Sequence, residues 1–227
     1  MRKPPVVSII IPARNQEKYI GRCIRSLLSL NYPRKDYEII VINDSSEDHT
    51  NKVLHAFKEE LIIFVNKKQL GLPGSLNRGI RHARGRYIIR VDADDYVHSE
   101  YINVLSMHLG FNESIDAVCC DYQLVDTDEK VIGIKKWFEE PIGCGIMFRI
   151  EDIIELGLYD EKMKIHEDKE LLIRFLDKHN IYSIPLPLYR YRRHENNITN
   201  QKDEMNSYLK ILKEKYSENI YAKRMFK

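Results

Sequence analysis

The chain is short of cysteine and has almost no net charge, and both shortages narrow the classes of protein to which it can belong. Its 227 residues include four cysteines, Cys23, Cys119, Cys120 and Cys144, without any C-x-x-C spacing. This pattern argues against a zinc site and against a disulfide framework, and it predicts a chain that is kept reduced in the cytoplasm. A formal net charge of +2 gives no reason to expect a nucleic-acid partner.

Long apolar runs are also missing. Only residues 6–11 are mostly apolar before Pro12, which is too short for a signal peptide or a membrane span, and no later stretch reaches the required length. We therefore expect no segment that crosses a bilayer, and a cytoplasmic chain that at most lies peripherally on the inner face of a membrane. The length suits one domain, or one domain with an appendage.

Two nucleotide-binding motifs are absent as well. The turn after the first predicted strand reads Pro-Ala-Arg-Asn-Gln-Glu over residues 12–17, where a dinucleotide-binding site would carry G-x-G-x-x-G. The glycine-rich phosphate loop that ends in G-K-[ST] is not found either. These absences disfavour a dinucleotide-dependent enzyme and a P-loop enzyme.

The chain does contain short apolar runs, rich in β-branched residues, that predict buried strands. They cover residues 6–11, 37–42, 61–65 and 87–91, so that their starts are 31, 24 and 26 positions apart. Between them, three apolar stripes at helical spacing predict helices: Ile20, Ile24, Leu27 and Leu28; Val53, Leu54 and Phe57; and Leu76, Ile80 and Ala83. Ser45 and Asp48 have the spacing of a capping box for the second helix. This alternation predicts an α/β fold with a mostly parallel, doubly wound sheet.

The second half has a less regular pattern. We expect strands at 117–123, 131–134 and 143–148, a short helix at 151–156, extended segments at 181–184 and 188–192, and two further helices, one with its stripe at 171–176 and one from 205 to 216. Glu167 and Asp168 fall in the first turn of the former. The pattern predicts a smaller, mixed half and a C-terminal helix.

The most informative stretch is residues 86–96, where an apolar run stops at Asp92, Asp94 and Asp95. Alternation along a strand places Asp92 and Asp94 on the same side, where two negative charges repel unless a cation lies between them. Mn²⁺ and Mg²⁺ prefer oxygen ligands, and Mg²⁺ is commonly shared between one or two carboxylates and the phosphates of a substrate. The implied substrate is a nucleoside diphosphate derivative.

Two other interpretations of this stretch must be weighed. Aspartates after a strand also form ordinary turns. An EF-hand loop is excluded because Val97 and Asn103 stand where it needs Gly and Glu. In a doubly wound sheet, ligands bind beyond the carboxyl ends of the strands, and polar residues follow the first, second and fourth predicted strands there. This favours a binding site over a plain turn.

Taken together, six segments resemble the motifs of glycosyltransferase family 2 in order and spacing: residues 7–15, 41–50, 85–95, 157–161, 167–168 and 191–194. The resemblance implies a GT-A fold over residues 1–200, with a nucleotide-binding half at about 1–96 and an acceptor-side half at about 97–200, followed by a helical tail at 201–227. It also implies inverting, metal-assisted transfer of a sugar from a nucleoside diphosphate, usually UDP, to a hydroxyl of a glycan or lipid-linked acceptor.

The resemblance assigns roles to individual residues. Four positions would hold the nucleoside: Pro12, Arg14, Glu17 and Asp44. Asp92 would contact the ribose or the base. Asp94 would bind Mn²⁺ or Mg²⁺, and His194 would reach the metal or the diphosphate. Many relatives carry an aromatic residue in place of Arg14, so the preference for uracil is open.

Asp168 is the expected general base for the incoming hydroxyl, although Glu167 and Asp168 also suit the helix dipole alone. The Q-x-x-R-W motif of processive enzymes is missing, which predicts transfer of a single sugar. Trp137 and Phe138 raise the hypothesis of an aromatic platform for the acceptor, with a core position as the alternative.

The tail after residue 200 carries seven basic residues and four acidic ones. It can pack on its own domain, form a homodimer or lie on an anionic membrane surface. Two rival functions remain: a nucleotidyltransferase, which normally has a glycine-rich basic loop that this chain lacks, and a non-catalytic partner subunit that binds a nucleotide sugar.

Overall fold

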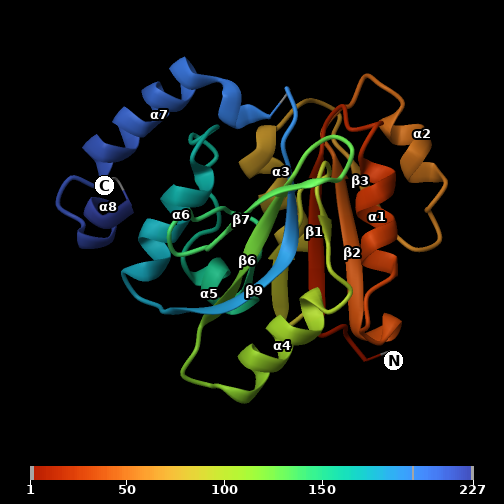
Figure 1. Ribbon diagram of the computed structural model, residues 1–227, viewed down its shortest axis with the longest axis horizontal. Coiled ribbons are helices and arrows are strands. Elements are labelled where there is room, and N and C mark those ends of the chain that lie inside the picture. Colours follow the sequence, from red (N-terminus) through yellow and green to blue (C-terminus); the bar gives the residue numbers. More distant parts are fainter. Residues whose placement is uncertain (1–2, 196, 226–227) are drawn as a thin grey trace.

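A computed structural model describes residues 3–195 and 197–225 (Figure 1). In this part of the chain the strands form one sheet in the order β3-β2-β1-β4-β8-β6-β9-β5, with β7 paired to β6. The strands are β1 (Val7–Ala13), β2 (Tyr37–Asn43), β3 (Ile62–Val65), β4 (Tyr87–Arg90), β5 (Tyr96–Val97), β6 (Ala117–Val125), β7 (Val131–Lys135), β8 (Ile146–Arg149) and β9 (Ile181–Arg192). The α-helices are α1 (Ile20–Leu28), α2 (Thr50–His55), α3 (Gly71–His82), α4 (Tyr101–Phe111), α5 (Ile150–Glu155), α6 (Glu167–Leu176), α7 (Lys202–Lys215) and α8 (Ile220–Met225).

The first half is parallel, as its apolar runs predict. Strand β1 pairs in parallel with β2 on one side and β4 on the other, and β2 pairs in parallel with β3. All seven residues of β2 are buried. A central strand covered on both faces has no solvent side, which explains its continuous run of β-branched residues.

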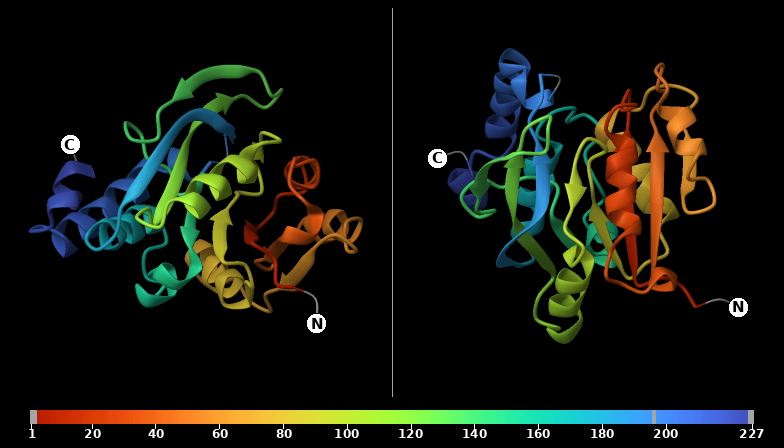
Figure 2. Two further views of the ribbon diagram at one scale, coloured as in Figure 1. Left: turned by 90° about the horizontal axis from the view of Figure 1, so that it is seen from below. Right: turned by 45° about the vertical axis from the view of Figure 1, so that its right-hand side comes forward.

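Helices cover both faces of this half, as the views in Figure 2 show. Ile9 and Ile11 of β1 pack into the same apolar cluster as Ile24 of α1. Ile10, which points the other way, packs with Leu76 of α3. The alternation of one strand between two helices confirms the doubly wound arrangement.

The second half is mixed. Strand β8 is antiparallel to both β4 and β6, whereas β9 is parallel to β6. The two predicted extended segments, 181–184 and 188–192, are one strand, β9, whose pairing with β6 shifts in register on both sides of Asp121. Because of this bulge, Pro185 and Pro187 interrupt the apolar pattern without ending the strand.

The predicted capping box is wrong. Ser45 has a left-handed φ of +56°, and its hydroxyl donates to the Asn66 carbonyl at 2.8 Å. Helix α2 begins only at Thr50, whose backbone N–H donates to Asp48 Oδ1 at 2.9 Å. The link after β2 is therefore longer than the spacing suggested, and Asp48 bonds the first turn from closer in sequence.

The hypothesis of a Trp137 platform is also wrong. The Trp137 side chain is 2% exposed, and its Nε1–H donates to the Ile142 carbonyl at 3.0 Å. Phe138, in contrast, is 64% exposed. The indole takes the core position that was the alternative.

The C-terminal helices pack on α6. Leu212 of α7 and Ala222 of α8 are buried in one cluster with Met163 and Ile173. Within residues 3–195 and 197–225, no helix is both long and apolar enough to cross a membrane. The packing is the first of the three alternatives for the tail, while dimerisation and membrane contact stay predictions.

Candidate active site

A cavity of about 450 Å³ opens at the carboxyl ends of β1, β2 and β4. Both halves of the sheet contribute to its walls. Of the residues predicted for the site, the cavity brings together Pro12, Arg14, Asp44, Asp92, Asp94 and Asp168. The position agrees with the rule that ligands bind beyond the carboxyl ends of parallel strands.

Asp44 lies buried at one end of this cavity. Its Oδ1 accepts hydrogen bonds from Asn66 Nδ2 at 2.6 Å and from the Leu70 N–H at 2.8 Å. Its Oδ2 accepts one from the Gly71 N–H at 2.9 Å. The carboxylate thus binds the N-terminus of α3, where orphan amides and the helix dipole favour a negative charge. Asp44 fixes the start of α3 and also lines the cavity.

Arg14 and Glu17 differ in placement. The Arg14 guanidinium donates from Nη1 to the carbonyls of Asp44 and Ser45, at 3.0 and 3.1 Å, and so forms part of the wall. Glu17 is exposed and does not line the cavity, and its carboxylate accepts a hydrogen bond from the His49 N–H at 2.8 Å. The structure therefore does not bring Glu17 to the other residues that were predicted to hold the nucleoside.

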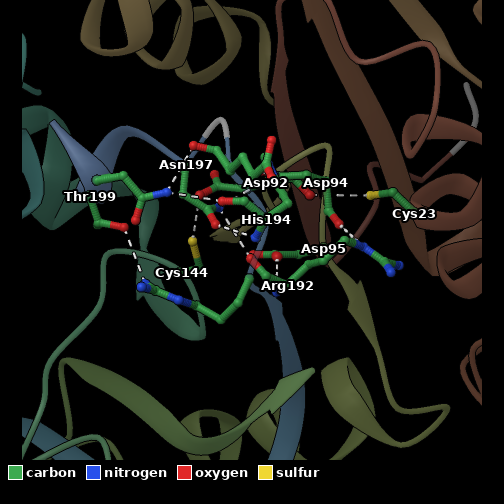
Figure 3. Close-up of polar contacts among 12 residues, drawn as sticks. Cys23, Asp92, Asp94, Asp95, Cys144, Arg192, His194, Asn197 and Thr199 are labelled. Carbon is green, nitrogen blue, oxygen red and sulfur yellow. Dashed lines mark hydrogen bonds and ion pairs between the residues drawn. The ribbon is translucent and has the colours of Figure 1, made fainter. Parts of the chain in front are cut away.

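Asp92 has its negative charge compensated by the protein. Arg90 donates from Nε and Nη2 to its two carboxylate oxygens at 2.6 and 3.0 Å. The Cys144 thiol donates to Oδ2 at 2.9 Å (Figure 3). The expectation of one cation between Asp92 and Asp94 was based on strand alternation, and that basis does not hold. Strand β4 ends at Arg90 and the aspartates form a turn, closed by a bond from the Asp95 N–H to the Asp92 carbonyl, so the alternation of a strand no longer applies.

Asp94 and His194 do come together, although 100 positions separate them in sequence. His194 Nε2 lies 2.8 Å from Asp94 Oδ2 (Figure 3). The imidazole is stacked on the Tyr19 ring at 5.1 Å between centroids. A carboxylate and an imidazole at this separation are compatible with two positions in the coordination shell of one Mn²⁺ ion. Asp94 lines the cavity, so the phosphates of a ligand have access to the same position.

Asp95, in contrast, is buried and bonded to β9. Its oxygens accept hydrogen bonds from the Tyr189 hydroxyl and the Arg192 N–H, both at 2.7 Å. Burial, with the charges of Asp94 and Asp92, raises its pKa well above the ordinary value. Asp92, Asp95 and Cys144 also present ligand atoms within 4.8 Å of one another. Because both carboxylates already have protein partners and burial raises the pKa of the Cys144 thiol, Asp94 and His194 fit a cation better.

The first turn of α6 forms another part of the cavity wall. His166, which precedes the helix, has a left-handed φ of +61° and lines the cavity together with Glu167 and Asp168. Burial, followed by the charge of Asp168, raises the pKa of Glu167 to about 7. A non-glycine residue in this conformation next to a carboxylate of raised pKa is typical of a functional site.

Sequence reasoning missed Arg90. Its side chain is only 10% exposed and also donates from Nη1 to Glu167 Oε1 at 2.8 Å. One guanidinium therefore joins Asp92, just after β4, to Glu167 in the first turn of α6. The available signal was a charged residue inside the apolar run 87–91, which no pattern for a buried strand explains.

Because Gly143 has no side chain, Asp168 and Arg90 can both lie close to its backbone. A Cβ atom at this position would lie 2.6 Å from Asp168 Cβ and 3.0 Å from Arg90 Nη1. The tail contributes as well, because Met205 lines the cavity and its carbonyl lies 3.2 Å from His166 Nε2. The cavity wall thus extends past the boundary at residue 200 that the sequence suggested.

Comparison with known proteins gives consistent matches. A profile described as "Glycosyl transferase family 2" matches residues 8–164. An uncharacterised glycosyltransferase of Rickettsia typhi is 28% identical over 217 residues, covering 86% of this chain and 66% of the relative. The probable glycosyltransferase YdaM of Bacillus subtilis is 31% identical over 199 residues, covering 77% of this chain and 47% of the relative. The chain thus spans at most about two thirds of these relatives.

Solved structures share the fold. S. aureus TarS 1–349 in complex with UDP-GlcNAc superposes with a TM-score of 0.75 at 18% identity, covering 90% of this chain and 64% of that one. The mannosyltransferase PcManGT from Pyrobaculum calidifontis, in complex with GDP-Man and Mn²⁺, gives a TM-score of 0.72 at 17% identity, covering 91% and 62%. These likenesses confirm the GT-A fold. With this fold and a profile matched over more than half of its length, the chain belongs to glycosyltransferase family 2.

Proposed function

We propose that this protein is an inverting glycosyltransferase that moves one sugar from a nucleoside diphosphate to a hydroxyl group. One observation carries the proposal: a single cavity has Asp94, paired with His194, on one wall and Asp168 on another. An enzyme of this kind needs both a sink for charge on the departing diphosphate and a base for the attacking hydroxyl.

UDP-sugar is the donor that the observations favour. A structural neighbour binds UDP-GlcNAc, although another binds GDP-Man. In this chain, Pro12, Arg14, Asp44 and Asp92 all line the cavity, and Arg90 links Asp92 to Glu167 of α6. The Arg14 guanidinium has a planar face on which a base can stack. Glu17 would act only by holding the α2 loop, through its bond to His49.

Asp94 and His194 would hold the divalent cation, Mn²⁺ or Mg²⁺, which when bound supplies Lewis-acid stabilisation of the diphosphate. Asp168 accepts the proton of the acceptor hydroxyl while the oxygen of that hydroxyl attacks the anomeric carbon. The bond from that carbon to the diphosphate oxygen breaks in the same step, with inversion, and the nucleoside diphosphate leaves with the bonding electron pair. Arg90 holds Asp92 and Glu167 in place while the charges move.

The acceptor is proposed to be a glycan or a lipid-linked sugar, with residues 1–200 as the catalytic domain and α7 completing its wall. Contact of the tail with the inner face of a membrane would suit a lipid-linked acceptor. Assays with Mn²⁺ and a panel of UDP- and GDP-sugars test the proposal. They measure the release of free sugar and of the nucleoside diphosphate. We expect slow metal-dependent hydrolysis that Asp94→Ala abolishes.

Two further measurements separate the rival functions. Donor binding without turnover in the presence of any acceptor would favour a non-catalytic partner subunit. Release of pyrophosphate from a nucleoside triphosphate and a sugar phosphate would favour a nucleotidyltransferase. Either result would contradict the proposed transfer.

A further inference from the structure

A second cluster of metal-ligating side chains lies at the other end of the sheet. Asp116, Asp152 and His179 each present one oxygen or nitrogen, and these three atoms lie within 4.8 Å of one another. None of the three lines the catalytic cavity. Strand β6 runs parallel to β4, because both are antiparallel to β8, so Asp116, just before β6, lies opposite the end where β4 meets the cavity.

The topology brings these residues together. Strands β6 and β9 begin side by side, with Ala117 opposite Ile181, and β8 ends beside them, with Phe148 opposite Ala117. Asp116 directly precedes β6, and His179 follows α6 just before β9. Asp152 lies in the first turn of α5, which starts where β8 stops. Three separate connections therefore converge on one point.

Two atoms of this cluster are buried without a partner. In the described part of the chain, three buried side-chain atoms lack any hydrogen bond, and two of them are Asp152 Oδ2 and His179 Nε2. An unsatisfied buried polar atom destabilises the folded protein, and more so when its group is charged. Two such atoms in one His/Asp/Asp cluster indicate that a bound species completes it.

The surroundings hold the ligands in place. Asp116 Oδ2 accepts a hydrogen bond from the Asn180 N–H at 2.9 Å and lies 3.6 Å from His179 Nδ1. The His179 ring packs on the Phe175 ring at 4.8 Å between centroids. The Nε and Nη2 groups of Arg149 donate to backbone carbonyls instead of to these carboxylates. A small dication would offset two carboxylates without needing space for another side chain.

We propose that Asp116, Asp152 and His179 bind one divalent cation of the Zn²⁺ type. Two carboxylates and an imidazole match the oxygen and nitrogen ligands of Zn²⁺, and water completes the coordination. The cation cross-links the start of α5, the end of α6 and the loop before β6. It stabilises α6 at the end opposite Asp168 and does not depend on the function proposed above.

Zinc titration of the whole chain tests this site. The background is the Asp94→Ala/His194→Ala variant, which removes the other expected cation site, stripped of metal with a chelator. Competition with a colorimetric chelator should show one Zn²⁺ per chain. Asp152→Asn or His179→Gln in that background should weaken the affinity by more than about 100-fold, since loss of even an outer-shell partner costs ~10–100-fold. Exposed Asp128→Asn and His55→Gln are the matched controls and should not change it.

Thermal unfolding provides a second measurement. Zn²⁺ should raise the melting temperature of the background variant and of both controls, and should leave that of the Asp152→Asn variant unchanged. Absence of Zn²⁺ binding would mean that water or a protonated imidazole fills the cluster, and would overturn the proposal. Equal Zn²⁺ affinity in the ligand variants and the controls would overturn it too, as would binding of Mg²⁺ without Zn²⁺.

Discussion

The two halves of the sheet bring carboxylates to the same cavity in different electrostatic states. In the parallel half, Asp44 is held by the amides at the start of α3, and Asp92 is paired with Arg90. In the mixed half, burial and the neighbouring Asp168 raise the pKa of Glu167 to about 7 despite its bond to Arg90. Carboxylates with compensated charge suit binding, whereas a carboxylate pair under mutual repulsion suits proton transfer.

The Asp168→Asn variant tests the role of the mixed half in proton transfer, and it should have the largest effect on activity. Loss of a general base typically lowers turnover by about 10²–10⁴-fold. Affinity for the nucleoside diphosphate should remain, because the residues assigned to it lie in the parallel half. Steady-state transfer assays check this, with Asp177→Asn, exposed at the end of the same helix, as the control. Unimpaired turnover would show that another group takes the proton.

Arg90→Met breaks the connection between the halves. Removing one partner of a buried ion pair typically costs about 3–5 kcal/mol, and here two carboxylates lose their partner. We expect a loss of this size in denaturant unfolding, together with lower turnover. Arg86→Met, an exposed arginine just before β4, should cost little. If Arg90→Met reduced only donor affinity, the two halves would not be coupled through Arg90.

The pH dependence of stability tests whether Glu167, in the mixed half, has a raised pKa. Glu167 has a pKa of about 7 in the folded protein and an ordinary value of 4.5, so the folded state binds the proton more tightly. Stability therefore falls as pH rises between these two values, by roughly 3 kcal/mol at 1.36 kcal/mol per pH unit, and levels off above. Urea unfolding from pH 4 to 8 measures this. The Glu167→Gln variant should lack this component, and the same slope in that variant would assign it to another group.

Gly143→Ala should have the smallest effect. The added Cβ would lie 2.6 Å from Asp168 Cβ, so α6 or the loop before β8 must move. We expect turnover to fall by about tenfold, because the shift displaces Asp168 and a misplacement of about 1 Å can lower the rate by ~10²-fold. In the control variant, Gly133→Ala, the nearest atom is Leu124 Cδ1 at 3.8 Å, an ordinary contact. Equal activity of the two variants would show that the position of Asp168 tolerates the shift.

The parallel half could be predicted strand by strand, because each central strand is covered on both faces and its sequence is a continuous apolar run. The motif residues Asp94, His194 and Asp168 could be placed at one site only through resemblance, since no local pattern relates positions 94 and 194. Asp92 was misplaced because alternation was extended two residues beyond the end of β4 at Arg90.

Arg90 and Met205 could not be assigned from the sequence. The role of Arg90 depends on the start of α6 lying beside the end of β4, although 77 positions separate Arg90 from Glu167. Met205 reaches the cavity because α7 folds back onto α6 through Leu212. Both follow from packing between distant segments, where periodicity carries no information.

Calorimetric titration of UDP, with and without Mn²⁺, tests the division of roles between Asp94 and Asp168 most directly. We expect Mn²⁺ to strengthen UDP binding to the wild type and to the Asp168→Asn variant alike. In the Asp94→Ala variant, Mn²⁺ should no longer strengthen it. An unchanged Mn²⁺ effect in Asp94→Ala, or loss of UDP binding in Asp168→Asn, would contradict the assignment of the cation to one wall and the base to the other.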